Sequence, residues 1–352
     1  MPARFDRILI FNSAFPGDIV LTTPLIRAAY QSFPGASLTF CTTEAGASLL
    51  AGMSYLDSLI VYDKHGRDKG TWGMLKTAAR LRRESFDLVF AAHRSARTAM
   101  LLALAGIPVR VGFQHGSASW LYTHLAKRRP GAHETERNLS LLGPLGIELG
   151  ELSRKPVLPV TGEEANHVFG HLGVGLPRGR GPLVIVAPGS VWGTKQWFAD
   201  RFAGLIELLT AAHAARVIMV GSPLDRAQAD KVADACRCEF LDLVGMTDLR
   251  GLTALIRKAD LVITGDSAPM HIAWAMDTPA VAIFGATTPE LGFAPLSGRC
   301  RVVEIKSLEC RPCSEHGPRN CPLGHFRCMS GITVDMVMTA CEEMLRLGPD
   351  RN

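Results

Sequence analysis

The sequence predicts an α/β protein built from two doubly wound domains, each with a parallel sheet between layers of helices. Short apolar runs alternate with segments of helical composition up to residue 112, and a second such series begins at residue 183. Between them, residues 150–181 are rich in Gly, Pro and Arg and contain no strong strand. Because strands that alternate with helices form parallel sheets, the two series predict two Rossmann-like domains facing a central cleft.

The overall composition agrees with this fold class. The chain has 352 residues, of which 47% are hydrophobic and 20% charged, as is typical of a folded protein of two domains. Its formal net charge of +5 is compatible with anionic partners. No basic helix with interleaved aromatic residues indicates nucleic-acid binding, so we expect no nucleic acid as a partner.

The sequence also indicates a cellular compartment. The first apolar run, residues 7–11, is too short for a signal peptide, and no stretch is long enough for a transmembrane helix. We therefore expect a cytoplasmic protein. Its nine cysteines are then expected to be thiols or metal ligands rather than disulfides.

The first domain is predicted to span residues 1–165. Its strands read as continuous apolar runs, as buried parallel strands do, and turn residues such as Pro34-Gly35 separate them from helices. The expected strands are 7–11, 37–41, 58–62, 86–91 and 109–112. The expected helices are 19–32, 46–51, 73–83 and 96–105, followed by a loop-rich segment at 113–129 and helices at 133–142 and 163–172.

The second domain is predicted to span residues 166–335 by the same alternation. The expected strands are 183–187, 216–220, 241–243, 261–263 and 280–284. The expected helices are 199–212, 227–236, 249–259 and 270–276. Residues 336–352 are expected to form a C-terminal helix that packs back toward the first domain.

A polar turn at residues 264–267 is the most informative feature of the second domain. Thr264, Gly265, Asp266 and Ser267 follow a buried strand and precede a helix that contains His271. Such a turn offers free backbone N–H groups and a helix N-terminus to an anion, and open α/β sheets bind ligands at this edge. The turn therefore indicates a phosphate-bearing ligand, or else an ordinary strand–helix connection with His271 as a satisfied, partly buried residue.

Two further strand ends of this domain carry polar residues. Ser190 and Lys195 follow the strand 183–187 in a glycine-containing loop that suits phosphate binding, although the GK[ST] triplet of a P-loop is missing. Lys195 is equally compatible with a solvated surface position. Asp225 follows the strand 216–220 and is a candidate ligand of ribose hydroxyls, or else caps the next helix.

In the first domain, Asp18 lies in the loop after the first strand. A carboxylate at the end of a strand, next to Gly17, is a candidate general base, whereas a residue just before a helix at 19–32 is expected to cap it. His93 and Arg94 follow the strand 86–91, and Arg137 lies in the segment 133–142. These three residues are candidate ligands of an anionic acceptor, although a solvated helix face also explains Arg137.

Four cysteines are concentrated near the C-terminus. Cys310, Cys313, Cys321 and Cys328 have the spacing C-x2-C-x7-C-x6-C. Four thiolates close a tetrahedral site, so a structural zinc or an iron–sulfur centre is one interpretation. Free thiols and a redox pair are the others.

Three segments together resemble one family. PGDIVLTTPLIRA at 16–28, APGSVWGTKQW at 187–197 and TGDSAPMHIAWAMDTPAVAIFGATTP at 264–289 are similar to the best-marked segments of the lipopolysaccharide heptosyltransferases, glycosyltransferase family 9. HETERNLSLL at 133–142 resembles a fourth. The DS-x-x-MH form of the third segment is closer to the enzyme that adds the second heptose, heptosyltransferase II, than to the one that adds the first.

The resemblance implies a GT-B fold and an inverting transfer of heptose from ADP-heptose to the lipid A–core oligosaccharide, with no metal required for catalysis. Asp18 would then be the general base and Lys195 a ligand of the diphosphate. The nucleotide-sugar turn would comprise Thr264, Gly265, Asp266, Ser267, Met270 and His271. Alternatives are a transferase of this fold with another nucleotide sugar, and a nucleotide-sugar epimerase.

The same resemblance implies that the protein acts at the cytoplasmic surface of the inner membrane. The basic segments 76–83 and 127–129 are expected to hold the protein at anionic lipid as a peripheral contact, without an anchor.

Overall fold

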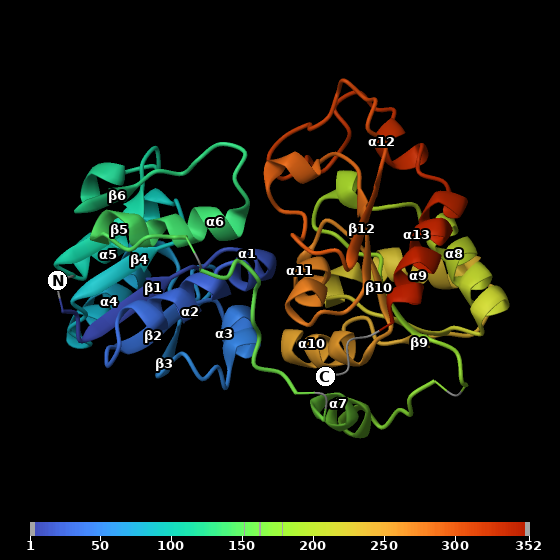
Figure 1. The fold of residues 1–352 in the computed structure, drawn as a ribbon, viewed down its shortest axis with the longest axis horizontal. Helices are drawn as coiled ribbons and strands as arrows, with labels where there is room; N and C mark the ends of the chain where they lie inside the picture. Colours follow the sequence, from blue (N-terminus) through green and yellow to red (C-terminus); the bar gives the residue numbers. More distant parts are fainter. Residues whose placement is uncertain (1–3, 151, 162, 178, 349–352) are drawn as a thin grey trace. The chain divides into compact units, whose positions relative to one another are not determined.

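A computed structural model describes residues 4–150, 152–161, 163–177 and 179–348. The chain divides into two compact units, unit 1 (Met1–Pro159) and unit 2 (Val160–Asn352). Each unit contains one six-stranded sheet in which all pairings are parallel (Figure 1). The predicted α/β class with two doubly wound sheets is therefore confirmed.

The sheet of unit 1 has the order β3-β2-β1-β4-β5-β6. Its strands are β1 (Arg7–Phe11), β2 (Ser37–Thr42), β3 (Ser58–Val61), β4 (Leu88–Ala91), β5 (Val109–Phe113) and β6 (His124–Ala126). Its helices are α1 (Pro16–Val20), α2 (Thr23–Ser32), α3 (Glu44–Leu50), α4 (Gly70–Arg83), α5 (Ala96–Leu104) and α6 (Glu134–Leu139), with the 3-10 helices η1 (Ser119–Leu121) and η2 (Ser140–Leu145).

The sheet of unit 2 has the order β12-β11-β10-β7-β8-β9. Its strands are β7 (Leu183–Ala187), β8 (Arg216–Met219), β9 (Leu241–Asp242), β10 (Leu261–Gly265), β11 (Ala280–Phe284) and β12 (Cys300–Glu304). Its helices are α7 (Glu164–Leu172), α8 (Ala199–His213), α9 (Arg226–Ala235), α10 (Leu249–Lys258), α11 (Ala268–Ala275), α12 (Arg327–Ser330) and α13 (Val334–Leu347). Its 3-10 helices are η3 (Gly193–Lys195), η4 (Pro223–Asp225) and η5 (Pro289–Leu291).

The strand order identifies one switch point in each sheet. In unit 1 the chain winds outward from β1 through β2 to β3, and then from β4 in the opposite direction. In unit 2 it winds outward from β7 and then, in the opposite direction, from β10. Ligands of open α/β sheets bind at the carboxyl ends of strands beside such a point, because the two following loops diverge there. The loops after β1 and β4, and after β7 and β10, are therefore the places where a site is expected.

Several elements differ from the sequence prediction. The helix expected at 133–142 is α6 followed by the 3-10 helix η2, and α12 was not expected. The single helix expected at 19–32 is divided into α1 and α2, because Pro24 lies in the first turn of α2 and cannot continue a helix from α1. The loop-rich segment 113–129 contains β6, and a further strand, β12, follows Pro289. Both additional strands lie at sheet edges, where short strands form by pairing with a neighbour rather than from a strong apolar pattern.

The structure also defines where the two units divide and where the C-terminal helix packs. The contacts divide the chain at Pro159, whereas the sequence placed the boundary at 165. Helix α7 packs against α10, which assigns it to unit 2. Helix α13, which was expected to pack toward the first domain, buries Val337, Ala340 and Cys341 in the core of unit 2. Residues 349–352 of the predicted segment 336–352 lie outside the described residues.

Candidate active site

A buried ion pair connects the loops after β7 and β10 of unit 2. The Nζ atom of Lys195 lies 2.6 Å from Oδ2 of Asp266, and their side chains are 10% and 7% exposed. Thr287, which follows β11, donates its hydroxyl to the same oxygen at 2.8 Å. Three strand ends thus meet at one carboxylate. Since an ammonium group has three N–H donors, the contact with Asp266 orients Lys195 and leaves it capacity for a further anion.

The turn after β10 requires a glycine because two loops lie close together. A Cβ atom at Gly265 would lie 2.9 Å from the carbonyl oxygen of Lys195. One residue later the chain reaches Asp266, and the hydroxyls of Thr264 and Ser267 lie 3.0 Å apart across the turn. The predicted turn is therefore present, and its close contact with the Lys195 loop is a feature that only the structure reveals.

Helix α11 begins directly after this turn, with Pro269 in its first turn. His271 is buried at 4% exposure. Met270 is completely buried and packs with Ala282 and Phe284. Met270, a predicted substrate ligand, therefore offers no accessible side-chain surface in this structure and acts as a core residue.

Asp225 and Ser190 lie in neighbouring loops. The Oδ2 atom of Asp225 accepts bonds from the backbone N–H and the hydroxyl of Ser222, at 2.8 and 2.7 Å, in a capping box of η4. Asp225 is the N-cap residue of α9 by position, but its side chain makes no capping hydrogen bond to that helix, so the predicted cap of the next helix is wrong. A Cβ atom at Gly189 would lie 2.1 Å from the carboxyl carbon of Asp225, so this side chain borders the Ser190 loop. The Ser190 hydroxyl accepts the N–H of Trp192 at 3.2 Å. The ribose role of Asp225 stays a prediction.

The cysteine-bearing segment packs against the lysine of the site. The Thr194 hydroxyl donates to the carbonyl oxygen of Pro318 at 2.5 Å. Gly317 has a φ of +76°, and a Cβ atom there would lie 3.5 Å from Cε of Lys195. No local residue pattern connects residues 317–318 with Lys195.

Arg311 attaches this segment to the loop that carries Thr287. Its guanidinium group is almost fully buried, pairs with Glu304 at 3.0 Å and donates to the carbonyl oxygens of Gly285, Ile305 and Thr287. Sequence reasoning missed Arg311, because an arginine between two cysteines carries no signal of its own. Thr287 was also missed, although the strand-end rule applied to β11 indicates it.

The four cysteines lie near one another. Cys310, Cys313 and Cys321 line a cavity of about 240 Å³. Slight burial opposes the ionisation of Cys321, but backbone N–H groups of residues 323–326 lower the pKa of its thiol. Burial, together with the three other cysteines, raises the pKa of Cys328. In the part of the chain that the structure describes, no three His, Cys, Asp or Glu side chains are arranged to hold a metal ion.

In unit 1, Asp18 lies in the first turn of α1, directly after β1. Helix α1 begins at Pro16 with Phe15 as its N-cap, so the prediction that Asp18 caps a helix beginning at Ile19 is wrong. Its backbone carbonyl accepts the Thr22 hydroxyl at 2.7 Å. The acidic side chain therefore stands at the switch point of the sheet.

Cationic groups gather near the same edge of unit 1. Lys64, two residues beyond Tyr62, donates to the carbonyl oxygen of Ser13 in the loop after β1, at 2.7 Å. Burial, with the positive charges of Lys64 and Arg94, lowers the pKa of His93 to about 4, so this imidazole is neutral at pH 7. Burial, and next the charge of Arg97, lowers the pKa of Lys64. The sequence singled out His93 and Arg94 but missed Lys64, which the strand-end rule also indicates.

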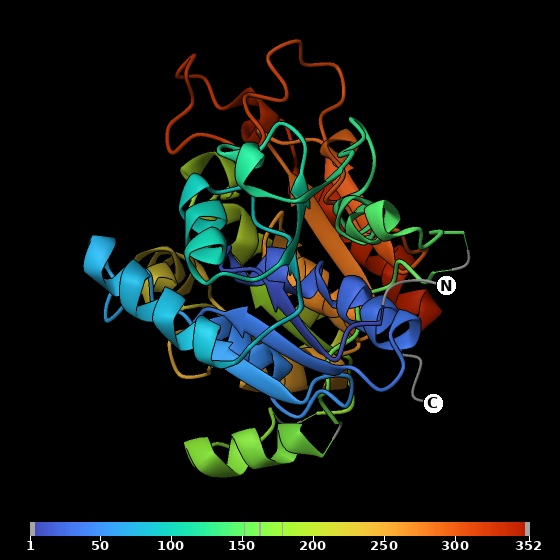
Figure 2. The ribbon, with the colours of Figure 1, turned by 90° about the vertical axis from the view of Figure 1, so that its left-hand side faces the viewer.

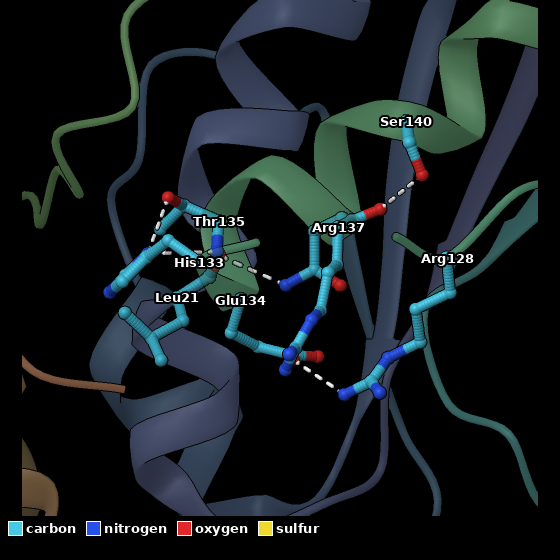
Figure 3. Close-up of polar contacts among 8 residues, drawn as sticks. Leu21, Arg128, His133, Glu134, Thr135, Arg137 and Ser140 are labelled. Carbon is cyan, nitrogen blue, oxygen red and sulfur yellow. Dashed lines mark hydrogen bonds and ion pairs between the residues drawn. The ribbon is translucent and has the colours of Figure 1, made fainter. Parts of the chain in front are cut away.

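A second cluster surrounds the N-terminus of α6, as Figure 3 shows. Arg128 and Arg137 each place a guanidinium nitrogen 2.9 Å from Oε2 of Glu134. Arg137 is 5% exposed and His133 is also buried, so the interpretation of these residues as a solvated helix face is wrong. The Asn138 amide donates to the carbonyl oxygen of Leu21 at 3.1 Å and attaches α6 to the link between α1 and α2. Both guanidinium groups therefore converge on one carboxylate.

None of the helices in the described ranges is long and apolar enough to cross a bilayer.

Comparisons with known proteins agree with this architecture. Residues 74–323 match the model of glycosyltransferase family 9 (heptosyltransferase). The chain is 30% identical to lipopolysaccharide heptosyltransferase 3 of Escherichia coli K12 over 287 residues, which are 78% of this chain and 80% of that protein. It is 24% identical to lipopolysaccharide heptosyltransferase 2 of the same strain over 311 residues, 85% of this chain and 88% of that protein.

Solved structures share the fold. A family 9 glycosyl transferase from Veillonella parvula superposes with a TM-score of 0.86 at 22% identity, covering 99% of both chains. The ADP-heptose lps heptosyltransferase II of E. coli superposes with a TM-score of 0.81 at 22% identity, covering 97% of this chain and 99% of that one. These similarities show that the chain has a GT-B fold of two Rossmann-like units.

Proposed function

The chain belongs to glycosyltransferase family 9, and we propose that it transfers heptose from ADP-heptose to a sugar hydroxyl of the lipopolysaccharide inner core. The observation that carries the proposal is the match of residues 74–323, because this range contains Lys195, Asp266 and Thr287. The reaction of this family releases a nucleoside diphosphate, and the residues of the site suit the binding of a diphosphate. ADP-heptose is the donor of the E. coli heptosyltransferase II, and lipopolysaccharide is the acceptor class of the heptosyltransferase 3 relative.

The relatives differ in which heptose of the inner core they transfer. The expected similarity to heptosyltransferase II rested on the DS-x-x-MH turn. Of the two E. coli proteins compared above, however, heptosyltransferase 3 is the more similar, at 30% against 24% identity. We therefore propose an inner-core heptose without choosing the second one.

For the donor, we propose that unit 2 binds the ADP moiety. Lys195 neutralises the departing diphosphate with the N–H donors that Asp266 does not occupy. The turn from Thr264 to Ser267 offers backbone N–H groups at the beginning of α11, where the helix dipole favours an anion. Asp225 and Ser190 border the adjacent loops and are proposed to contact the remainder of the donor.

For the chemistry, we propose that Asp18 is the general base. Its carboxylate removes the proton of the acceptor hydroxyl while the oxygen attacks the anomeric carbon. The bond between this carbon and the diphosphate oxygen breaks, ADP leaves, and the configuration inverts because attack comes from the opposite face. No metal ion takes part in this scheme, since Lys195 and the turn supply the positive charge.

For the acceptor, we propose that Lys64, Arg94 and the Arg128–Arg137 cluster of unit 1 bind its anionic groups. Neutral His93 is available as a hydrogen-bonding partner of sugar hydroxyls. The acceptor is lipid-linked, so the protein is proposed to work in the cytoplasm at the surface of the inner membrane.

The test is ADP release from ADP-heptose with and without heptose-deficient lipopolysaccharide. Acceptor-dependent release is expected from the wild-type protein. Release that does not depend on the acceptor, or release only from another nucleotide sugar, would contradict the proposed reaction. Asp18→Asn is expected to reduce the rate of transfer at least about a hundredfold, because a general base typically contributes that much to the rate. The affinity for ADP-heptose should stay unchanged. Retained turnover in this variant would exclude Asp18 as the base.

A further inference from the structure

We propose that the outer surface of α4 and α5 in unit 1 docks the protein on an anionic lipid bilayer. This inference rests on the proposed function only in its expectation that the acceptor is embedded in a membrane. The surface, which we call the α4–α5 face, comprises Trp72 and Leu75 of α4, Met100 and Leu104 of α5, and Trp120 of the adjoining η1. Figure 2 shows α4 on the outside of unit 1.

The two helices present their outer sides in the same direction. Met74, Ala78 and Leu81 of α4 pack into the same core cluster as Leu101 and Leu102 of α5, on one face of the sheet. The helices also pack against each other, and η1 packs against α5. Because their inner sides share one core, the exposed residues on their opposite sides point away from the sheet together.

The exposure of the aromatic residues on this face is unusual. Trp72 is 81% exposed and Trp120 is 80% exposed, whereas tryptophan is highly buried on average. Along α4, Trp72, Leu75 and Ala79 recur at helical spacing on the solvent side. Exposed apolar residues that cluster in this way indicate a surface with a partner.

The charges on the face identify the partner. The segment 69–83 has no acidic residue, and its basic residues are Lys69, Lys76, Arg80, Arg82 and Arg83. In α5 the one charged residue is Arg97. Lys69, Lys76 and Arg83 are exposed, whereas Arg80 and Arg82 donate to backbone carbonyl groups of unit 1. A helix with Trp and Leu on its outer side and Lys or Arg beside them suits the interface of an anionic bilayer, where the aromatic rings lie at headgroup level.

The structure also corrects one part of the sequence-based expectation. Of the basic run 127–129, Arg128 is mostly buried and pairs with Glu134, so it is not available to a lipid headgroup. The segment 76–83, by contrast, keeps Lys76 and Arg83 on the surface. Lys127 and Arg129 are exposed, so the fold removes only Arg128 from the second basic segment.

The test is sedimentation of the full-length protein with vesicles of phosphatidylcholine, with or without phosphatidylglycerol. Binding is expected only to the anionic vesicles and is expected to weaken as salt rises. Lys76→Gln with Arg83→Gln should weaken binding roughly thirtyfold, because each cation near the surface contributes about 1 kcal/mol and 1.4 kcal/mol is tenfold. Trp72→Ser with Leu75→Ser should weaken it at least about tenfold. Leu224→Ser, at an exposed position of unit 2, is the matched control and should have no effect.

Binding that is equal on neutral and anionic vesicles, or equal in the variants and the wild type, would overturn the proposal. Retention of the wild type only when a second protein is added would also overturn it, in favour of a protein partner. The variants keep their buried residues, so unchanged thermal unfolding verifies that they fold.

Turnover separates this proposal from the proposed function. Trp72→Ser with Leu75→Ser should transfer normally to a deacylated, soluble acceptor and poorly to an acceptor in anionic vesicles. Equal loss on both acceptors would contradict docking. The wild type could show no turnover on either acceptor and still bind vesicles more tightly than Trp72→Ser with Leu75→Ser does. In that case the docking proposal stands and the proposed function fails.

Discussion

Replacing Lys195 by methionine removes the cation that faces Asp266 and leaves this carboxylate buried. The pair is separated by 2.6 Å, and both side chains are at most 10% exposed. Removing one partner of a buried pair costs about 3–5 kcal/mol, because the remaining charge has lost both water and its counterion. For a unit of this size, 3 kcal/mol corresponds to a decrease of roughly 6–12 °C in the melting temperature of unit 2.

Urea and thermal unfolding of Lys195→Met measure this effect. The exposed Lys231 of α9 provides the control, since Lys231→Met should change the free energy of unfolding by less than about 0.5 kcal/mol. Lys195→Met combined with Asp266→Asn removes both charges and should recover most of the lost stability. If Lys195→Met is no more destabilising than Lys231→Met, the reasoning about the buried pair is wrong.

Donor binding distinguishes the structural role of Lys195 from its proposed role. The double variant restores neutrality but lacks the ammonium group, so its affinity for ADP should stay at least about tenfold below that of the wild type. Calorimetric titration with ADP measures this. Recovery of ADP affinity together with stability would show that Lys195 acts only by positioning the loops, and would remove it from the diphosphate site.

Three further predictions follow from individual contacts. The pKa of His93 is about 4 in the folded protein and 6.5 in the unfolded chain, so below pH 6.5 the unfolded chain binds a proton that the folded protein does not. The free energy of unfolding should therefore fall by up to roughly 3 kcal/mol between pH 6.5 and 4. Urea unfolding of His93→Gln over the same pH range should show a smaller fall. Gly265→Ala should destabilise unit 2 by about 1–3 kcal/mol in thermal unfolding, because its Cβ meets the Lys195 carbonyl, whereas Gly298→Ala, with open space around it, should be neutral. Cys321 should react with iodoacetamide before Cys328, since the pKa of the Cys321 thiol is lowered and that of the Cys328 thiol is raised. Protection of all four cysteines, lost on chelation together with stoichiometric zinc or iron, would contradict this order and favour the metal-centre interpretation of the cysteine spacing.

The sequence alone determined the fold class and most of the elements. Buried parallel strands such as β7 and β10 are local apolar runs, so their positions are visible without tertiary information. The strand-end rule likewise indicated Lys195, Asp266 and Asp18, because loops at the carboxyl ends of parallel strands lie at the ligand-binding edge. These predictions needed only the order of residues along the chain.

The tertiary structure decided which of these residues meet. Lys195 and Asp266 are 71 residues apart, and they pair because β7 and β10 are neighbours in the sheet. The edge strands β6 and β12 depend on a neighbour in the same way. Arg311 contacts Glu304 and four carbonyl groups whose positions are set by β11 and β12. Strand order and side-chain pairing depend on contacts between distant segments, and a local pattern of residue types does not specify those contacts.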